Sequence, residues 1–180
     1  MRLLRTPCRP CRLGIAAFLL LAAVIRPAAA PAQSEPTALE GKAAVHLYFA
    51  DRKTDVLRSE VRAIEMSGGR TGPIQRIIEA LIAGPKSELM RTLPAETALR
   101  AVYWSEDGTA IVDFTDTLVA THPGGCATEL LTVFSIVNTL VLNLDEVRQV
   151  KILVGGRESA TLAGHVDIRY PLQAEMLMVQ

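Results

Sequence analysis

The sequence predicts a two-layer α+β domain, in which two helices pack on one face of a mixed β-sheet and the elements follow the order ββαββαβ. Residues 73–83 and 126–142 carry apolar side chains at helical spacing, and each apolar stripe needs a surface to cover it. The segments around them alternate apolar and polar residues between turn residues, which is typical of strands. The turns between neighbouring strands are short, so we expect local hairpins.

The first hairpin is expected in residues 44–65, as a strand over 44–50, a charged turn over 51–55 and a second strand over 56–65. In the first strand the apolar residues alternate with others: Val45, Leu47 and Phe49. In the second strand one face is mainly apolar: Leu57, Val61 and Ala63. Its other face is charged, and we expect that face to be solvated: Arg58, Glu60 and Arg62.

The helix over residues 73–83 has clear boundaries in the sequence. Pro73 suits the first helical position, where its missing N–H costs nothing. Gly84 can adopt the left-handed conformation after the last turn, and Pro85 prevents continuation. The apolar stripe is expected to face the core: Ile74, Ile77, Ile78, Leu81 and Ile82.

The second half of the chain repeats this pattern without repeating residues. A strand over 96–105 and a return strand over 109–114 form a second hairpin across the turn Glu106-Asp107-Gly108. A connection over 115–125 leads to the helix over 126–142, where Asn143 is a plausible C-cap. The following strand, 147–154, is far enough away for a parallel crossover. Residues 160–170 are predicted to be extended, and 172–180 form a Met-rich tail that is unstructured by default.

Residues 1–32 have the pattern of a secretory signal peptide. Arg2, Arg5, Arg9 and Arg12 precede an uncharged apolar run over 13–25, which is shorter than the ~20 residues of a membrane span. Small residues at Ala30 and Ala32 predict cleavage after Ala32, with a flexible linker over 33–43 and the domain over 44–171. We therefore expect export to the periplasm or the extracellular space, with no stable membrane anchor afterwards.

The charge of the chain changes once residues 1–32 are set aside. Five of the 19 Lys and Arg residues, and none of the 19 Asp and Glu residues, lie there, which leaves a net charge of −5 on the remainder. A negative balance argues against nucleic acid and anionic lipid headgroups as partners. The remainder keeps one cysteine, Cys126, so no internal disulfide is expected.

Several short runs, taken in order, resemble the GerMN domain, which is named for the spore-formation and germination protein GerM. These runs are Ala80-Leu-Ile-Ala-Gly-Pro85 after Pro73, Leu93-Pro-Ala-Glu-Thr-Ala-Leu99, Ala110-Ile-Val-Asp-Phe-Thr115, Ile136-Val-Asn-Thr-Leu140, and Val147-x-x-Val150-x-Ile152. The resemblance implies an extracytoplasmic α+β module related to ring-building motifs, used for scaffolding or partner binding. It supplies no catalytic residues. The chain has one copy, whereas GerM-like proteins often have two, which favours an envelope protein of unassigned role over a sporulation role.

One group of residues has the composition of a reactive site: Asp113, Asp116, His122 and Cys126. A cysteine at a helix N-terminus with a histidine as base could serve a small thiol-dependent hydrolase. The alternative is that Cys126 is a buried apolar filler, that His122 is a loop residue, and that the aspartates are turn residues. No second cysteine or nearby histidine completes the spacing of a zinc site, so we expect neither metal nor cofactor.

The sequence therefore favours a non-enzymatic envelope module that binds another envelope protein or itself. A cell-wall glycan-binding module is a further alternative, although one aromatic pair is weak support for sugar stacking. The candidate partner contacts are the charged strand face and two aromatic residues near a turn: Arg58, Glu60, Arg62, Tyr103 and Trp104.

Overall fold

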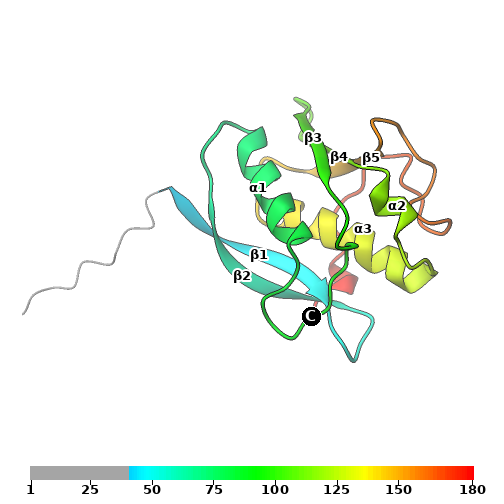
Figure 1. The fold of residues 1–180 in the computed structure, drawn as a ribbon. Coiled ribbons are helices and arrows are strands. Elements are labelled where there is room, and N and C mark those ends of the chain that lie inside the picture. Colours follow the sequence, from blue (N-terminus) through cyan, green and yellow to red (C-terminus); the bar gives the residue numbers. More distant parts are fainter. Residues whose placement is uncertain (1–40) are drawn as a thin grey trace, which may run out of the picture. The chain divides into compact units, whose positions relative to one another are not determined.

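A computed structural model describes residues 41–180, and Figure 1 shows the arrangement of its elements. The strands are β1 (Lys42–Ala50), β2 (Leu57–Glu65), β3 (Leu99–Trp104), β4 (Thr109–Phe114) and β5 (Gln149–Val154). The helices are α1 (Thr71–Ile82), α2 (Thr117–Ala120) and α3 (Cys126–Val141), with a short 3-10 turn η1 (Met176–Met178). The α+β class is confirmed, and the predicted order recurs with α2 added. The expected signal peptide and most of the expected linker lie outside the described residues.

The strands form two sheets, where one mixed sheet was expected. β1 and β2 pair antiparallel in a register that runs unbroken from Lys42 opposite Glu65 to Ala50 opposite Leu57. β3 and β4 form the second predicted hairpin, and β5 pairs parallel with β4, which confirms the predicted crossover.

The outer edge of β1 explains why the hairpin does not join the other sheet. His46 and Tyr48 direct their main-chain N–H groups away from β2, to Asn143 Oδ1 (2.8 Å) and Thr139 Oγ1 (3.1 Å). Ala50 exchanges two main-chain hydrogen bonds with Met90. Because these groups are already paired, no strand of the second sheet can add to β1.

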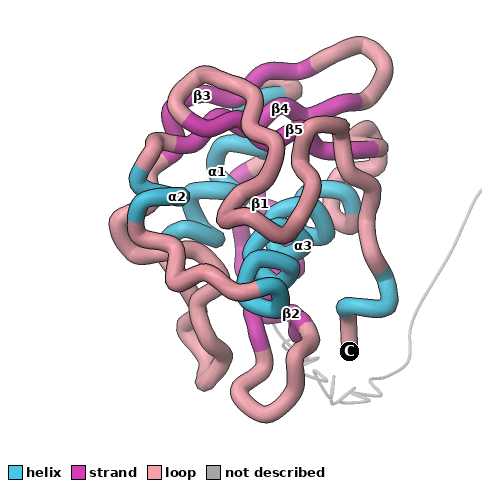
Figure 2. Tube along the Cα trace, turned by 90° about the vertical axis from the view of Figure 1, so that its right-hand side faces the viewer, coloured by secondary structure: helices cyan, strands magenta, loops and turns pink. Residues whose placement is uncertain are grey.

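The two long helices lie between the hairpin and the three-stranded sheet, as Figures 1 and 2 show from two directions. α1 contacts β1, β2 and β3, while α3 contacts β1 and β5. The main core gathers buried side chains from both helices and both sheets. A smaller cluster joins Tyr48, Ala50 and Leu57 of the hairpin to Leu131 of α3.

The predicted features of α1 are largely confirmed. Four of the five residues of its apolar stripe are buried, and Ile82 is half-buried. Gly84 has φ of 85°, the left-handed conformation expected after the last turn. The helix begins at Thr71, however, so Pro73 is its third residue and not its first. No basic residue lies in its last turn; instead, Arg62 and Arg91 from outside the helix donate to its last carbonyls.

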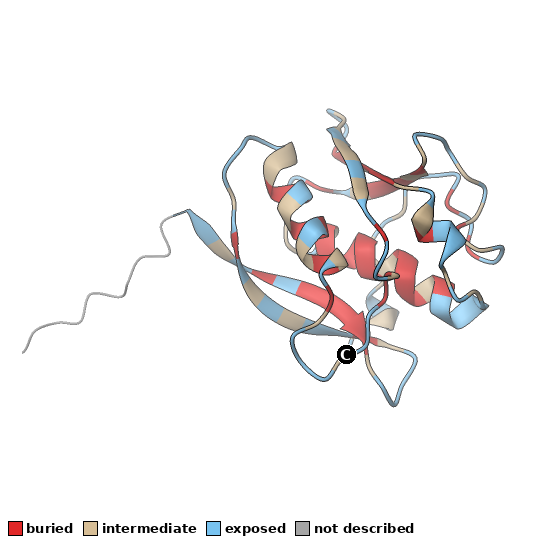
Figure 3. Ribbon diagram, viewed as in Figure 1, coloured by how far each residue is buried: buried red, intermediate tan, exposed pale blue. Residues whose placement is uncertain are grey.

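α3 is the most deeply buried element, and Figure 3 shows it buried along most of its length. Its apolar residues fill the core as predicted, but five polar residues are buried as well: Glu129, Thr132, Ser135, Asn138 and Thr139. A helix buried on every side cannot be described by a single apolar stripe.

The C-terminal region differs from its prediction in two ways. Residues 160–170 form a folded loop rather than an extended strand, with Leu162 and Ile168 buried. The tail is ordered, because Leu172 forms a bridge with Val150 and Gln180 N donates to Leu57 O at 3.0 Å. The default expectation of an unstructured tail is therefore wrong.

Candidate partner-binding surface

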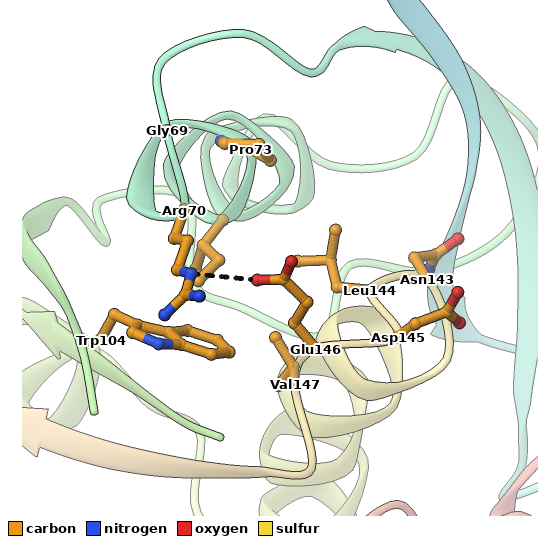
Figure 4. Close-up of a pocket in the computed structure, with 10 residues that line it drawn as sticks. Gly69, Arg70, Pro73, Trp104, Asn143, Leu144, Asp145, Glu146 and Val147 are labelled. Atoms are coloured by element: carbon orange, nitrogen blue, oxygen red, sulfur yellow. Dashed lines mark ion pairs between the residues drawn. The ribbon is translucent and has the colours of Figure 1, made fainter. Parts of the chain in front are cut away.

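A pocket of about 450 Å³ opens at the N-terminal end of α1, and we call it the α1 pocket (Figure 4). Three separate segments form it: the start of α1, the last residue of β3 and the loop from α3 to β5. Its apolar lining comes from Pro73, Ile74, Trp104, Leu144 and Val147. Its charged lining comes from Arg70, Asp145 and Glu146.

Arg70 joins two sides of the α1 pocket. Its guanidinium carbon lies 5.5 Å from the centre of the Trp104 ring, and its Nε lies 3.3 Å from Glu146 Oε2 (Figure 4). Both charged side chains are well exposed, so each interaction contributes about 1 kcal/mol or less to stability. The arrangement can therefore open or rearrange at little cost when another group enters the pocket.

The two predicted aromatic contacts lie on opposite faces of β3, because neighbouring residues of a strand alternate. Trp104 packs against the core and lines the α1 pocket. Tyr103 points away and is 52% exposed. They do not form one aromatic patch, and whether Tyr103 contacts a partner remains a prediction.

The expected solvated face of β2 is wrong for two of its three residues. The side chains of Glu60 and Arg62 are only 12% and 11% exposed, whereas Val61, expected on the core face, is 57% exposed. Arg58 is exposed and pairs with Asp51 at 3.1 Å. The residues of β2 alternate between two faces as predicted, but the charged face is the one that packs toward α1.

Glu60 and Arg62 connect β2 to the C-terminal end of α1. Arg62 donates to the carbonyls of Ala80 (3.0 Å) and Gly84 (2.5 Å), and its guanidinium lies 5.7 Å from the Phe49 ring centre. Glu60 accepts from Arg62 and from the N–H groups of Lys86 and Ser87. Burial raises the pKa of Glu60, but hydrogen bonds from Ser87, Arg62 and Lys86 outweigh burial and lower this pKa to about 2. These contacts give both residues a role within the fold; a contact with a partner remains a prediction.

The structure does not place His122 as a base for Cys126. Cys126 is exposed, which corrects the expectation of a buried filler. His122 Nδ1 accepts from Gly124 N (3.0 Å), so the neutral ring carries its proton on Nε2, which lies 3.0 Å from Thr132 Oγ1. Burial lowers the pKa of His122, although Glu129 raises it in part. Both ring nitrogens are therefore engaged by groups other than the thiol.

The two aspartates of the same group have different partners. Asp113 is buried on β4, where its Oδ1 accepts from Gly156 N at 2.8 Å. Asp116, the residue before α2, lies 3.6 Å from Arg157 Nη2. Within residues 41–180, no three His, Cys, Asp or Glu side chains are grouped so that they could hold a metal ion.

Glu129 of α3 is the most fully bonded carboxylate in the described part of the chain. It is completely buried and accepts main-chain N–H groups from Leu162, Ala163, His165 and Val166, together with His165 Nδ1. Burial raises the pKa of Glu129, but these hydrogen bonds outweigh burial and lower it. Glu129 thus fixes the loop over 161–166 onto α3.

Glu129 belongs to a line of polar residues that follows α3 and ends just beyond it, which we call the α3 polar line: Glu129, Thr132, Ser135, Asn138, Thr139 and Asn143. Its members bond segments from β1, the loop at Thr92, the loop over 161–166 and Glu175. Sequence reasoning missed this role, although polar residues three or four apart in an apolar helix were a visible signal. Arg70 and Glu146 of the α1 pocket carried no such signal, because they lie in separate loops.

Solved structures share this arrangement of elements, which is that of a GerMN-type domain. The first GerMN domain of the sporulation protein GerM from Bacillus subtilis is 21% identical, with a TM-score of 0.53 over 74% of this chain and 96% of that chain. The tandem GerMN domains of the same protein are 21% identical, with a TM-score of 0.58 over 73% of this chain. That match covers 46% of the tandem chain, or about half of it.

A protein from Clostridium perfringens, provisionally described as a lipoprotein, is 26% identical, with a TM-score of 0.54 over 77% of this chain and 91% of that chain. The chain itself belongs to the Germane family, described as sporulation and spore germination, whose model matches residues 46–160. The resemblance inferred from the sequence is therefore confirmed. None of the curated proteins compared with the chain matches it. Among residues 41–180, no helix is long and apolar enough to cross a membrane.

Proposed function

We propose that this chain is a non-enzymatic, protein-binding module of the cell envelope, and that its α1 pocket holds an apolar side chain of a partner protein. The observation that carries the proposal is the α1 pocket itself, where Trp104 forms an apolar wall beside a weakly held Arg70–Glu146 pair. Aromatic residues flanked by an arginine are the residue types that most often dominate binding energy at protein interfaces.

The chemistry of the pocket indicates what it would bind. Its lining offers Trp104 and four aliphatic residues to an apolar side chain. Asp145 and Glu146 outnumber Arg70 at its charged side, so a basic residue next to the apolar anchor would be favoured. We therefore expect the partner segment to combine an apolar residue with a lysine or arginine.

Three observations support an envelope location. Residues 1–32 have the pattern of a signal peptide. A structural neighbour is provisionally described as a lipoprotein, and other neighbours come from a sporulation protein. We propose export to the periplasm or the extracellular space, without assigning a process within the envelope.

The contacts of His122 argue against the thiol-dependent hydrolase. A thiol nucleophile needs a base within hydrogen-bond reach, and both nitrogens of His122 are engaged elsewhere. The binding function needs no such group, which is why we prefer it.

Site-specific photocrosslinking in the native cell tests the proposal. A photoreactive residue replaces Asp145 in the full chain, and a second chain carries it at Asp55 in the β1–β2 turn, outside the α1 pocket. We expect a defined protein adduct from position 145 only. Trp104→Ala should abolish this adduct, whereas Tyr103→Ala, on the opposite face of β3, should leave it intact.

Fluorescence then measures binding directly. Trp104 is the only tryptophan of the chain, so its emission reports the state of the pocket. The purified partner should shift this emission saturably. An adduct that persists in the Trp104→Ala chain, or a partner that leaves the emission unchanged, would refute a role for the α1 pocket.

A further inference from the structure

The outer edge of β2 is open, in contrast to that of β1. The outward N–H groups of His46 and Tyr48 show that these residues occupy non-hydrogen-bonded positions of the β1–β2 ladder. Their register partners are Val61 and Ser59, so those residues also direct their main-chain groups outward. Ala63 lies two residues after Val61 and therefore also directs its main-chain groups outward.

Nothing in the described part of the chain covers these groups. Residues 41–180 provide no hydrogen bond to the outward main-chain groups of Ser59, Val61 or Ala63. The two ends of β2 are covered, because the carbonyl of Leu57 accepts from Gln180 N and that of Glu65 accepts from Arg76 Nη1. Ser59, Val61 and Ala63 all have exposed side chains and therefore form an unpaired strand edge.

Two common protections of an edge strand, a proline and a bulge, are missing here. β2 contains no proline, and its register with β1 has no bulge. A groove of about 800 Å³ runs beside the edge, between β2 and the loop that follows α1. The groove leaves room for the side chains of an added strand on the face that carries Glu60 and Arg62.

We propose that β2 pairs antiparallel with β2 of a second copy of this chain, centred on Val61, to form a continuous four-stranded sheet. In this register Val61 faces Val61, and Ser59 faces Ala63 in both directions. All three outward residues of each copy then form the main-chain hydrogen bonds of an antiparallel ladder. The interface does not involve the α1 pocket, so the inference stands independently of the proposed partner binding.

The charged residues of β2 are complementary to those of a second β2, and they favour one register of pairing. With Val61 at the centre, Glu60 of each copy lies opposite Arg62 of the other. A shift of two residues in one direction places Glu60 opposite Glu60 and Arg58 opposite Arg62. A shift in the other direction places Arg62 opposite Arg62. Opposite charges across a strand pair stabilise it and like charges destabilise it, so only the Val61-centred register is favoured.

Interchain disulfide formation tests the register. Serine replaces all three native cysteines, Cys8, Cys11 and Cys126, and Val61→Cys or Ala63→Cys is added. Paired Val61 Cα atoms would lie about 5.5 Å apart, within the range that a disulfide spans. The two Ala63 residues would lie about 14 Å apart, four residues along the strands, which is too far. We expect rapid crosslinking of Val61→Cys and little of Ala63→Cys.

Sedimentation of the unmodified chain measures the association. An interface of this size is expected to be weak, so the range should extend to about 1 mM. The native chain should shift from monomer to dimer, and Val61→Lys should abolish the dimer because two lysines would meet at its centre. Ala44→Lys, a change at an exposed position of β1, should leave the dimer intact. A native monomer at every concentration, or equal crosslinking from positions 61 and 63, would overturn the proposal.

Discussion

Asn143 bonds both main-chain groups of His46, which lies 97 residues earlier in the chain: its Oδ1 accepts from His46 N and its Nδ2 donates to His46 O, each at 2.8 Å. The same Nδ2 donates to Thr139 O at 2.7 Å, within the last turns of α3. One amide side chain therefore takes the place of a neighbouring strand and also caps a helix. The C-cap of α3 is Leu142, one residue before the expected Asn143, although the Asn143 side chain does bond a carbonyl near the end of this helix. Its contact with β1 was not foreseen.

Loss of the Asn143 side chain should destabilise the protein clearly. In Asn143→Leu the N–H and C=O of His46 lose their partners, at a cost of about 2–3 kcal/mol in the free energy of unfolding. Thr139→Val removes only the acceptor for Tyr48 N and should cost about 1–2 kcal/mol. Urea denaturation measures both. A change below ~0.5 kcal/mol in Asn143→Leu would show that water replaces the side chain without loss.

Glu129 should make stability depend on pH. Hydrogen bonds lower its pKa in the folded state, so its contribution is present above the unfolded value of about 4.5 and is lost as the pH falls toward the folded value. Glu129→Gln should lower the free energy of unfolding by about 2–4 kcal/mol near neutral pH, because a buried carboxylate with five donors is lost. The variant should also lose less stability than the native chain between about pH 6 and about pH 3.

Glu96→Gln is the matched control for this experiment. Glu96 is exposed, and its side chain forms no hydrogen bond within residues 41–180. This variant should follow the native pH profile. Parallel profiles for Glu129→Gln and the native chain would show that Glu129 does not titrate as described.

The arginines at the end of α1 should differ in their contribution to stability. Arg62→Lys loses the planar fork that reaches Ala80 O and Gly84 O, and should cost about 1–3 kcal/mol. Arg91→Ala loses bonds to Ile82 O and Ala83 O from a more exposed position, and should cost about 1 kcal/mol. Arg58→Ala loses only a surface ion pair with Asp51 and should cost less than ~0.5 kcal/mol. Thermal or urea unfolding gives this ranking, and a reversed order would contradict the assigned roles.

Alkylation of Cys126 should not depend on His122. Cys126 is exposed and should react with iodoacetamide in the folded protein. Because His122 bonds Gly124 and Thr132, His122→Ala should leave the alkylation rate within about twofold of the native rate. A rate that falls tenfold or more in the variant would restore the thiol–base pair.

His122 should also contribute to the response of stability to acid. Burial lowers its pKa, so the folded state favours the neutral ring. This contribution is complete above the unfolded value of about 6.5 and is lost as the pH falls from there toward the folded value. His122→Gln should reduce the fall in stability between about pH 7 and about pH 5, measured by urea unfolding.

Local patterns were sufficient to predict most elements. The stripe of α1, the turn at Gly108 and the left-handed Gly84 each depend on residues close together in the chain. The parallel pairing of β5 with β4 followed from the length of the connection through α3. In these cases the physical cause lies within the segment itself.

The site could not be predicted in the same way, because its causes lie between segments. The charges of Glu60 and Arg62 predicted that these side chains face water. In the structure Arg62 instead donates to main-chain carbonyls at the end of α1, which have no partner within the helix. The division into two sheets depends on Asn143 and Thr139, far from β1 in sequence. The α1 pocket joins three segments, and no local spacing indicates that they meet.

The separation of the two sheets has a mechanical consequence. Within residues 41–180, no pair of strands connects the β1–β2 hairpin to β3, β4 or β5. A force that pulls the hairpin away from the three-stranded sheet would therefore act on helix packing and on isolated hydrogen bonds, such as those of Asn143 with His46 and of Met90 with Ala50, and not on a continuous strand ladder. In a loaded assembly, the contacts of the hairpin with the rest of the domain would therefore yield before the ladder between β4 and β5.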